Sequence, residues 1–77
     1  MTKKEYVLKM ANTDMELERK QYCKVVSVWA KSLRGAKQVS HKHADPDQFC
    51  LIFLNDELQA YILPSSSTWV DPCFYHL

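Results

Sequence analysis

The sequence predicts a small α+β protein of one domain, and three observations support this prediction. The chain has only 77 residues, which is enough for one hydrophobic core. Residues 14–34 carry apolar side chains at helical spacing. Residues 49–63 hold two apolar segments on either side of a short polar turn, the pattern of an antiparallel β-hairpin.

The composition is typical of a folded, water-soluble chain. It is 47% hydrophobic and 25% charged, with one Gly and three Pro, which argues against disorder. No apolar run approaches the roughly 18 residues of a membrane span, and the first residues do not resemble a targeting signal. Three cysteines at irregular spacing do not form a disulfide framework. We therefore expect a cytoplasmic protein with no membrane partner.

The N-terminal segment has features of both a helix and a strand. Thr2 and Glu5 have the spacing of a capping box, which favours a short helix through about Met10. The apolar run at residues 6–8 suits a strand nearly as well. Thr13 and Glu16 form a second capping box and predict the start of another helix.

A long amphipathic helix is expected from Asp14 to Arg34, with Gly35 ending it in the left-handed conformation. Trp29 lies in the middle of the apolar stripe of this helix, so we expect it in the core. The cluster of valines at positions 25, 26 and 28 favours a strand instead and is the main feature against the helix. The apolar stripe comprises Met15, Tyr22, Val25, Val26, Trp29 and Leu33.

Residues 37–48 have no apolar periodicity and are expected to form a loop. The hairpin follows, with strands at 49–54 and 58–63 around a turn at 55–57. Its first strand is apolar on both faces, so we expect one face against the long helix and the other against the C-terminal tail or a second molecule. The tail, residues 69–77, is too aromatic for a simple solvated end.

Charge is divided between the two parts of the chain. Residues 1–42 hold ten basic and four acidic residues (+6), whereas residues 43–77 hold no basic and five acidic residues (−5). A helix would gather several of the basic side chains on the face opposite its apolar stripe. Such a face can bind phosphates or an acidic protein surface. The expected binding residues are Arg19, Lys20, Lys24, Lys31, Arg34, Lys37 and Lys42.

The sequence therefore predicts a small non-catalytic, regulatory binding protein that engages nucleic acid, or the machinery that handles it, through a basic helix face. A solvated helix face balanced by the acidic hairpin half would produce the same pattern. A second hypothesis is a protein inhibitor or adaptor of the mobile-element type, which binds through the hairpin edge and the aromatic side chains of Trp69, Phe74 and Tyr75. Those aromatic side chains also suit packing onto the hairpin, and the opposite charges of the two halves suit a homodimer.

No cofactor is expected, although one group of side chains has the chemistry of a zinc site. His41, His43, Cys73 and His76 carry the ligand atoms that zinc prefers, but their spacing fits no standard zinc module. An enzyme is not expected either. The only nearby set of side chains suited to general acid–base catalysis is His41 or His43 with Asp45 or Asp47, and the chain has no glycine-rich phosphate loop.

Overall fold

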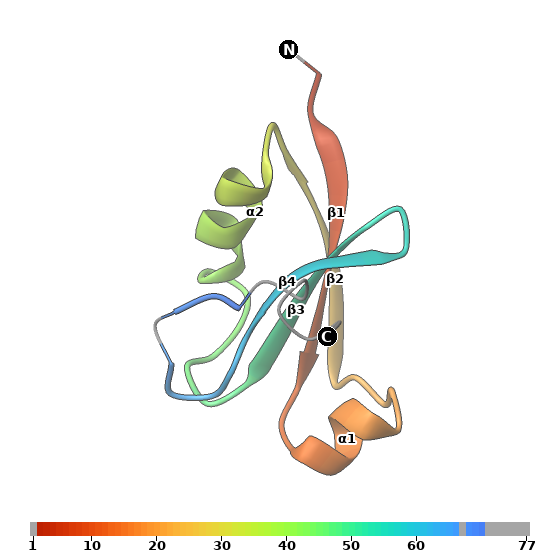
Figure 1. The fold of residues 1–77 in the computed structure, drawn as a ribbon, viewed down its shortest axis with the longest axis vertical. Coiled ribbons are helices and arrows are strands. Elements are labelled where there is room, and N and C mark those ends of the chain that lie inside the picture. The colour runs from red at the N-terminus through yellow and green to blue at the C-terminus, as the bar shows by residue number, and fades with distance from the viewer. Residues whose placement is uncertain (1, 67, 71–77) are drawn as a thin grey trace.

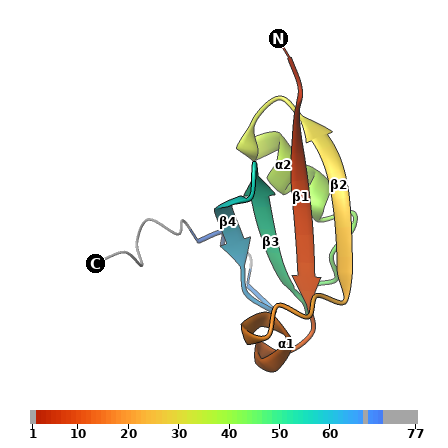
Figure 2. The ribbon, with the colours of Figure 1, turned by 90° about the vertical axis from the view of Figure 1, so that its right-hand side faces the viewer.

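A computed structural model describes residues 2–66 and 68–70. Four antiparallel strands form one sheet in the order β2-β1-β3-β4. Helix α2 packs on one face of the sheet, and the short helix α1 lies at one end of it (Figures 1 and 2). The elements are β1 (Lys4–Ala11), α1 (Asp14–Glu18), β2 (Lys24–Ala30), α2 (Leu33–Ser40), β3 (Phe49–Leu54) and β4 (Glu57–Ile62).

Strand β1 lies inside the sheet, paired with β2 on one side and β3 on the other. Tyr6, Leu8 and Met10 alternate along it and are buried on one face. This spacing of two residues is the period of a strand, and two neighbouring strands satisfy the backbone of β1. The expected N-terminal helix is therefore wrong, and the strand that suited the same residues is present.

The long helix is also wrong, although its predicted start is confirmed. The Thr13 hydroxyl oxygen accepts a hydrogen bond from the backbone N–H of Glu16 (3.2 Å), and the Glu16 carboxylate accepts one from the backbone N–H of Asn12 (2.9 Å). Helix α1 ends at Glu18, and Lys20 adopts a left-handed φ of 56° that turns the chain away. A short helix at the end of the sheet replaces the predicted long one.

Strand β2 occupies the middle of the predicted helix. Its even-numbered residues Val26, Val28 and Ala30 face α2 and pack in the core. Residues 25 and 29 share a face in a helix and in a strand, so the helical spacing was equally compatible with β2. β-branched valines beside an available partner strand favour the sheet. The face that carries Trp29 is the exposed one: the indole is 61% exposed, so its predicted core position is wrong.

Helix α2 lies where the sequence predicted a helix end and a loop. The Ser32 hydroxyl oxygen caps it by accepting a hydrogen bond from the Gly35 amide (3.3 Å). Gly35 therefore belongs to the first turn of α2 and does not terminate a helix. Ala36 and Ser40 are buried against the sheet. Because β2 and β3 lie on opposite sides of β1, the connection through α2 crosses β1 and covers one face of the sheet.

The hairpin is confirmed as β3 and β4. Asn55 and Asp56 form its turn with φ values of 52° and 65°, as two-residue hairpin turns require. The β3–β4 register shifts after Ile52, which pairs with Ala60, so that Phe53 pairs with Leu58. This bulge leaves one additional residue, Gln59, in β4.

The chain after β4 returns along the hairpin. Val70 pairs with Tyr61 through two backbone hydrogen bonds of 3.1 and 2.8 Å. Trp69 packs against the main core beneath α2. The sequence-based expectation placed it on the other face of the hairpin, so that expectation is wrong for this residue. Phe74 and Tyr75 lie outside the described residues. Within residues 2–66 and 68–70, no helix is long and apolar enough to cross a membrane.

Candidate binding face

Among residues 2–66 and 68–70, no helix lies along the sheet face opposite α2, which we call the open face (Figure 2). The pairing registers order its side chains in rows across the strands. Apolar and aromatic side chains form most of these rows, with Glu5 at one end and one lysine near the centre. From one end to the other the rows are Trp29 and Glu5; Ser27, Val7, Phe53 and Leu58; Val25, Lys9, Leu51 and Tyr61; and Ala11 with Phe49.

Three adjoining hollows run along this face. The first, about 510 Å³, lies between the start of β1 and the β3–β4 turn. The second, about 550 Å³, shares Asp56 with the first. The third, about 460 Å³, shares Lys20 and Tyr22 with the second and is mostly apolar. The open face therefore carries a row of three neighbouring shallow hollows between the β3–β4 turn and α1.

Lys9 occupies the middle hollow. Its ammonium nitrogen lies 4.6 Å from the centre of the Phe53 ring and 5.3 Å from the centre of the Tyr22 ring. These are cation–π distances, and they hold the positive charge above an aromatic surface. Among the described residues, Lys9 makes these two contacts and no ion pair. Its charge therefore stays available to an anionic ligand.

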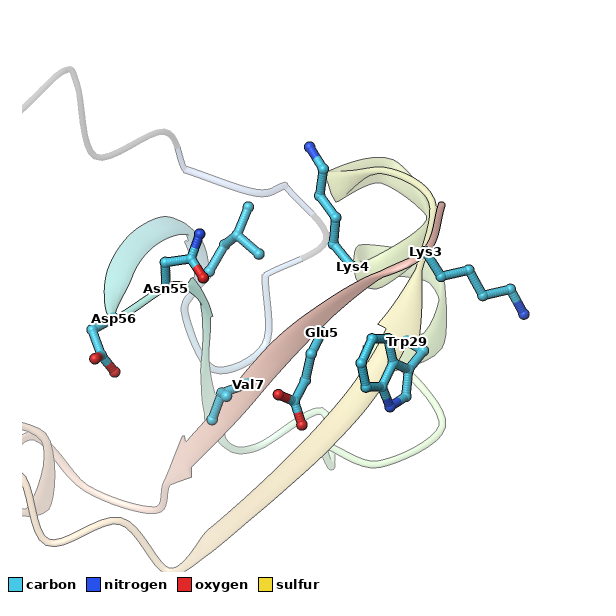
Figure 3. A pocket seen from close by; sticks show the side chains of 8 residues that line it. Lys3, Lys4, Glu5, Val7, Trp29, Asn55 and Asp56 are labelled. Atoms are coloured by element: carbon cyan, nitrogen blue, oxygen red, sulfur yellow. The ribbon is translucent and has the colours of Figure 1, made fainter. Parts of the chain in front are cut away.

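The first hollow combines an exposed indole with charged side chains of both signs. Figure 3 shows the Trp29 ring beside Glu5, its partner on β1, with Lys3 extending past the ring. Asn55 and Asp56 lie across the hollow at the hairpin turn. This end of the open face can contact both flat apolar groups and charged groups.

Helix α1 completes the other end of the open face. Leu17 and Tyr22, on and after α1, pack against the cluster formed by Ala11, Phe49 and Leu51. The left-handed turn at Lys20 places its side chain at the rim of two hollows. The left-handed turn after α1 thus places a second lysine beside Tyr22.

The basic residues predicted to bind an acidic partner are distributed over several elements of the structure. Arg19 and Lys20 follow α1, Lys31 precedes α2, Arg34 and Lys37 belong to α2, and Lys42 follows it. Lys24, in β2, donates a hydrogen bond of 2.9 Å to the His43 carbonyl oxygen. Of the predicted set, Lys20 lines the open face.

The two described histidines have structural contacts. The His41 ring meets the Trp69 ring edge-on, with 6.1 Å between centroids, and His43 accepts the Lys24 bond through its backbone. Cys73 and His76 lie outside the described residues. Within residues 2–66 and 68–70, no group of three or more His, Cys, Asp or Glu side chains is placed to hold a metal ion.

Cys50 is the buried thiol of the main core, on the α2 side of β3. Burial raises its pKa to about 11, and a hydrogen bond with Ser40 partly opposes this effect. The thiol therefore stays protonated at neutral pH and is a packing group rather than a nucleophile.

Sequence reasoning missed Lys9, Phe53 and Tyr22 as site residues. The signal that could have found them is the run at 49–54, which is apolar on both faces although α2 covers one face of the sheet. A comparison with protein-family models, curated proteins and solved structures found no match to this chain. The chemistry of the open face is thus the basis for assigning a function.

Proposed function

We propose that this protein is a non-catalytic binding protein that holds single-stranded nucleic acid on its open face. The observation that carries this proposal is the position of Lys9, whose ammonium group contacts two aromatic rings in the middle one of the three hollows. Sheets that bind single strands combine aromatic side chains, on which bases stack, with cations that contact the phosphates.

The spacing of the aromatic side chains supports this proposal. Phe53 pairs with Leu58, and Tyr61 pairs with Leu51 in the next row. The two rings therefore lie on neighbouring strands in adjacent rows, with the bulge at Gln59 between Leu58 and Tyr61. Tyr22 adds a third ring at the side of Lys9. Successive bases of an extended strand can therefore meet successive rings, whereas a duplex keeps its bases stacked inside.

Charge supports phosphate binding of moderate strength. Lys3, Lys9 and Lys20 line the hollows together with Glu5, Asp14 and Asp56, and Lys4 reaches the rim of the first hollow from the α2 side of the sheet. The excess of positive charge is small, so stacking supplies much of the affinity. We expect a dissociation constant in the micromolar range, with a salt dependence of roughly −2 in log–log form for about three contacted phosphates.

The test is fluorescence anisotropy with labelled oligo(dT) and oligo(U) of about a dozen nucleotides and with a duplex of the same length. Phe53→Leu keeps the apolar contact and removes the ring, so it should weaken single-strand binding about 5- to 100-fold, as expected for the loss of one stacked base. The oligo(dT) and oligo(U) arms show whether the sugar matters.

Lys9→Gln should weaken binding and reduce the salt slope, whereas Lys42→Gln, the same change on an exposed residue beyond α2, should leave both nearly unchanged. Each variant is first checked for native thermal unfolding. Equal binding of duplex and single strand, or no binding by the folded protein at low salt, would refute the proposal. The alternative hypothesis, that the open face binds a protein, would then be the one to test.

A further inference from the structure

The β2 edge of the sheet is unprotected. Within the described part of the chain, β2 pairs with β1 on one side and has no strand on the other. It is about 23 Å long at about 3.3 Å per residue. The β1–β2 register contains no shift, and β2 contains no proline and a single charged residue, Lys24. Edge strands usually carry register shifts, prolines or several charged side chains, which prevent pairing with another chain.

The opposite edge is different. Strand β4 contains a bulge, and Tyr61 in it pairs with Val70 of the following segment. The returning chain therefore occupies part of the β4 edge. An added strand is more easily accommodated at β2.

We propose that β2 pairs with β2 of a second copy of this chain, antiparallel and centred on Ser27. All seven residues of the strand then have a partner. Ser27 meets its own equivalent on the two-fold axis, Val25 meets Trp29, Val26 meets Val28, and Lys24 meets Ala30. The two sheets join into one of eight strands.

The side chains of β2 are self-complementary in this register. The side chains of Val25 and Trp29 are 55% and 61% exposed in the single chain. In the dimer, Val25 of each copy lies opposite Trp29 of the other copy, so this pair occurs twice. Aromatic and β-branched residues are favourable cross-strand neighbours. No charge faces a like charge, because Lys24 meets an alanine.

The two-fold axis explains why a second copy, rather than another protein, fits this edge. Each favourable pair in an isologous interface occurs twice. Opposite residues must also lie on the same face of the sheet, and the Ser27-centred register keeps both copies of α2 on one side. The small Ser27 side chain at the axis leaves room for the two flanking indole rings.

Sedimentation velocity on nuclease-treated protein tests for the dimer independently of any nucleic-acid binding. We expect reversible dimerisation that strengthens with concentration, and Trp29→Glu should raise the dissociation constant about tenfold or more because both aromatic–valine pairs are lost. Gln21→Glu, an exposed change before β2, is the matched control and should leave the constant unchanged. A chain that stays monomeric at high concentration would overturn the proposal.

Cysteine cross-linking tests the register. In a Cys23→Ser, Cys73→Ser background, Ser27→Cys should form a disulfide with its own copy, because directly opposite residues in a sheet lie within disulfide reach. Val25→Cys and Trp29→Cys should each cross-link poorly alone and readily when mixed. Equal cross-linking at all three positions, or none above a Gln21→Cys control, would exclude the Ser27-centred pairing.

Discussion

At the scale of single residues, Cys50 links packing to pH. Its folded-state pKa of about 11 exceeds the ordinary value of 9.0, so folded protein holds this proton more tightly than the unfolded chain. The resulting stabilisation is complete below about pH 9 and is lost as pH rises towards 11. Relative to Cys50→Ala, the wild-type free energy of unfolding should fall by roughly 2 kcal/mol over that interval.

Urea unfolding followed by tryptophan fluorescence at several pH values measures this difference. Cys23→Ala replaces the exposed cysteine and should keep the wild-type pH profile. If the Cys50→Ala and wild-type curves run parallel from pH 9 to 11, the buried thiol does not contribute the expected pH dependence.

At the scale of elements, the sequence is most informative where one local signal acts alone. The hairpin was predictable because Pro64 ends the second of its two apolar runs and Asn55-Asp56, between the runs, supplies residues that tolerate a positive φ. The predicted helix over residues 14–34 is wrong because the spacing of Val25 and Trp29 is compatible with both a helix and a strand. The choice between helix and strand for these residues depends on β1, which pairs with β2. The spacing of residues within 14–34 carries no information about this partner strand.

The hairpin turn supports a prediction at this scale. Asp56 has a φ of 65°, a conformation that costs aspartate some energy and glycine little. Asp56→Gly converts the turn to Asn-Gly, the preferred pair for two-residue hairpins, and should raise the melting temperature by several degrees, or about 0.5 kcal/mol. Differential scanning calorimetry measures the shift. Asp47→Gly, at a position without positive φ, should not stabilise, and a lower melting temperature for Asp56→Gly would contradict this account of the turn.

At the scale of the whole molecule, the segment after β4 closes the core. Trp69 packs beneath α2, meets the His41 ring, and has the Lys37 ammonium 5.9 Å from its ring centre. Trp69→Ala should therefore lower the free energy of unfolding by about 2 kcal/mol, less than the cost for a fully buried tryptophan. Trp29→Ala, at the exposed indole, is the control and should change the stability of the monomer far less.

Chemical denaturation of both variants at low protein concentration gives the comparison. Equal losses of stability would mean that Trp69 contributes no more to the core than an exposed side chain does. A loss confined to Trp69→Ala would show that the returning segment is part of the folded core, whereas the Trp29 indole on the open face is not.

The candidate site could be predicted only in part. The excess of basic residues before position 43 was visible, and Lys20 from that set lines the open face. The combination of Lys9, Tyr22 and Phe53 was not visible, because it joins β1, the segment after α1 and β3. A face assembled from three separate segments depends on strand order, which residue spacing does not encode.

The position of β1 inside the sheet has a consequence for how the chain folds during synthesis. Leu8 pairs with Val26 and also with Ile52, which follows it by 44 residues. A β1–β2 hairpin can therefore form early, but the second edge of β1 waits for β3. During that interval the apolar side chains of two strands remain uncovered, and closure requires a distant part of the chain. The slowest step of folding should be this arrival of β3 at β1, rather than formation of either hairpin.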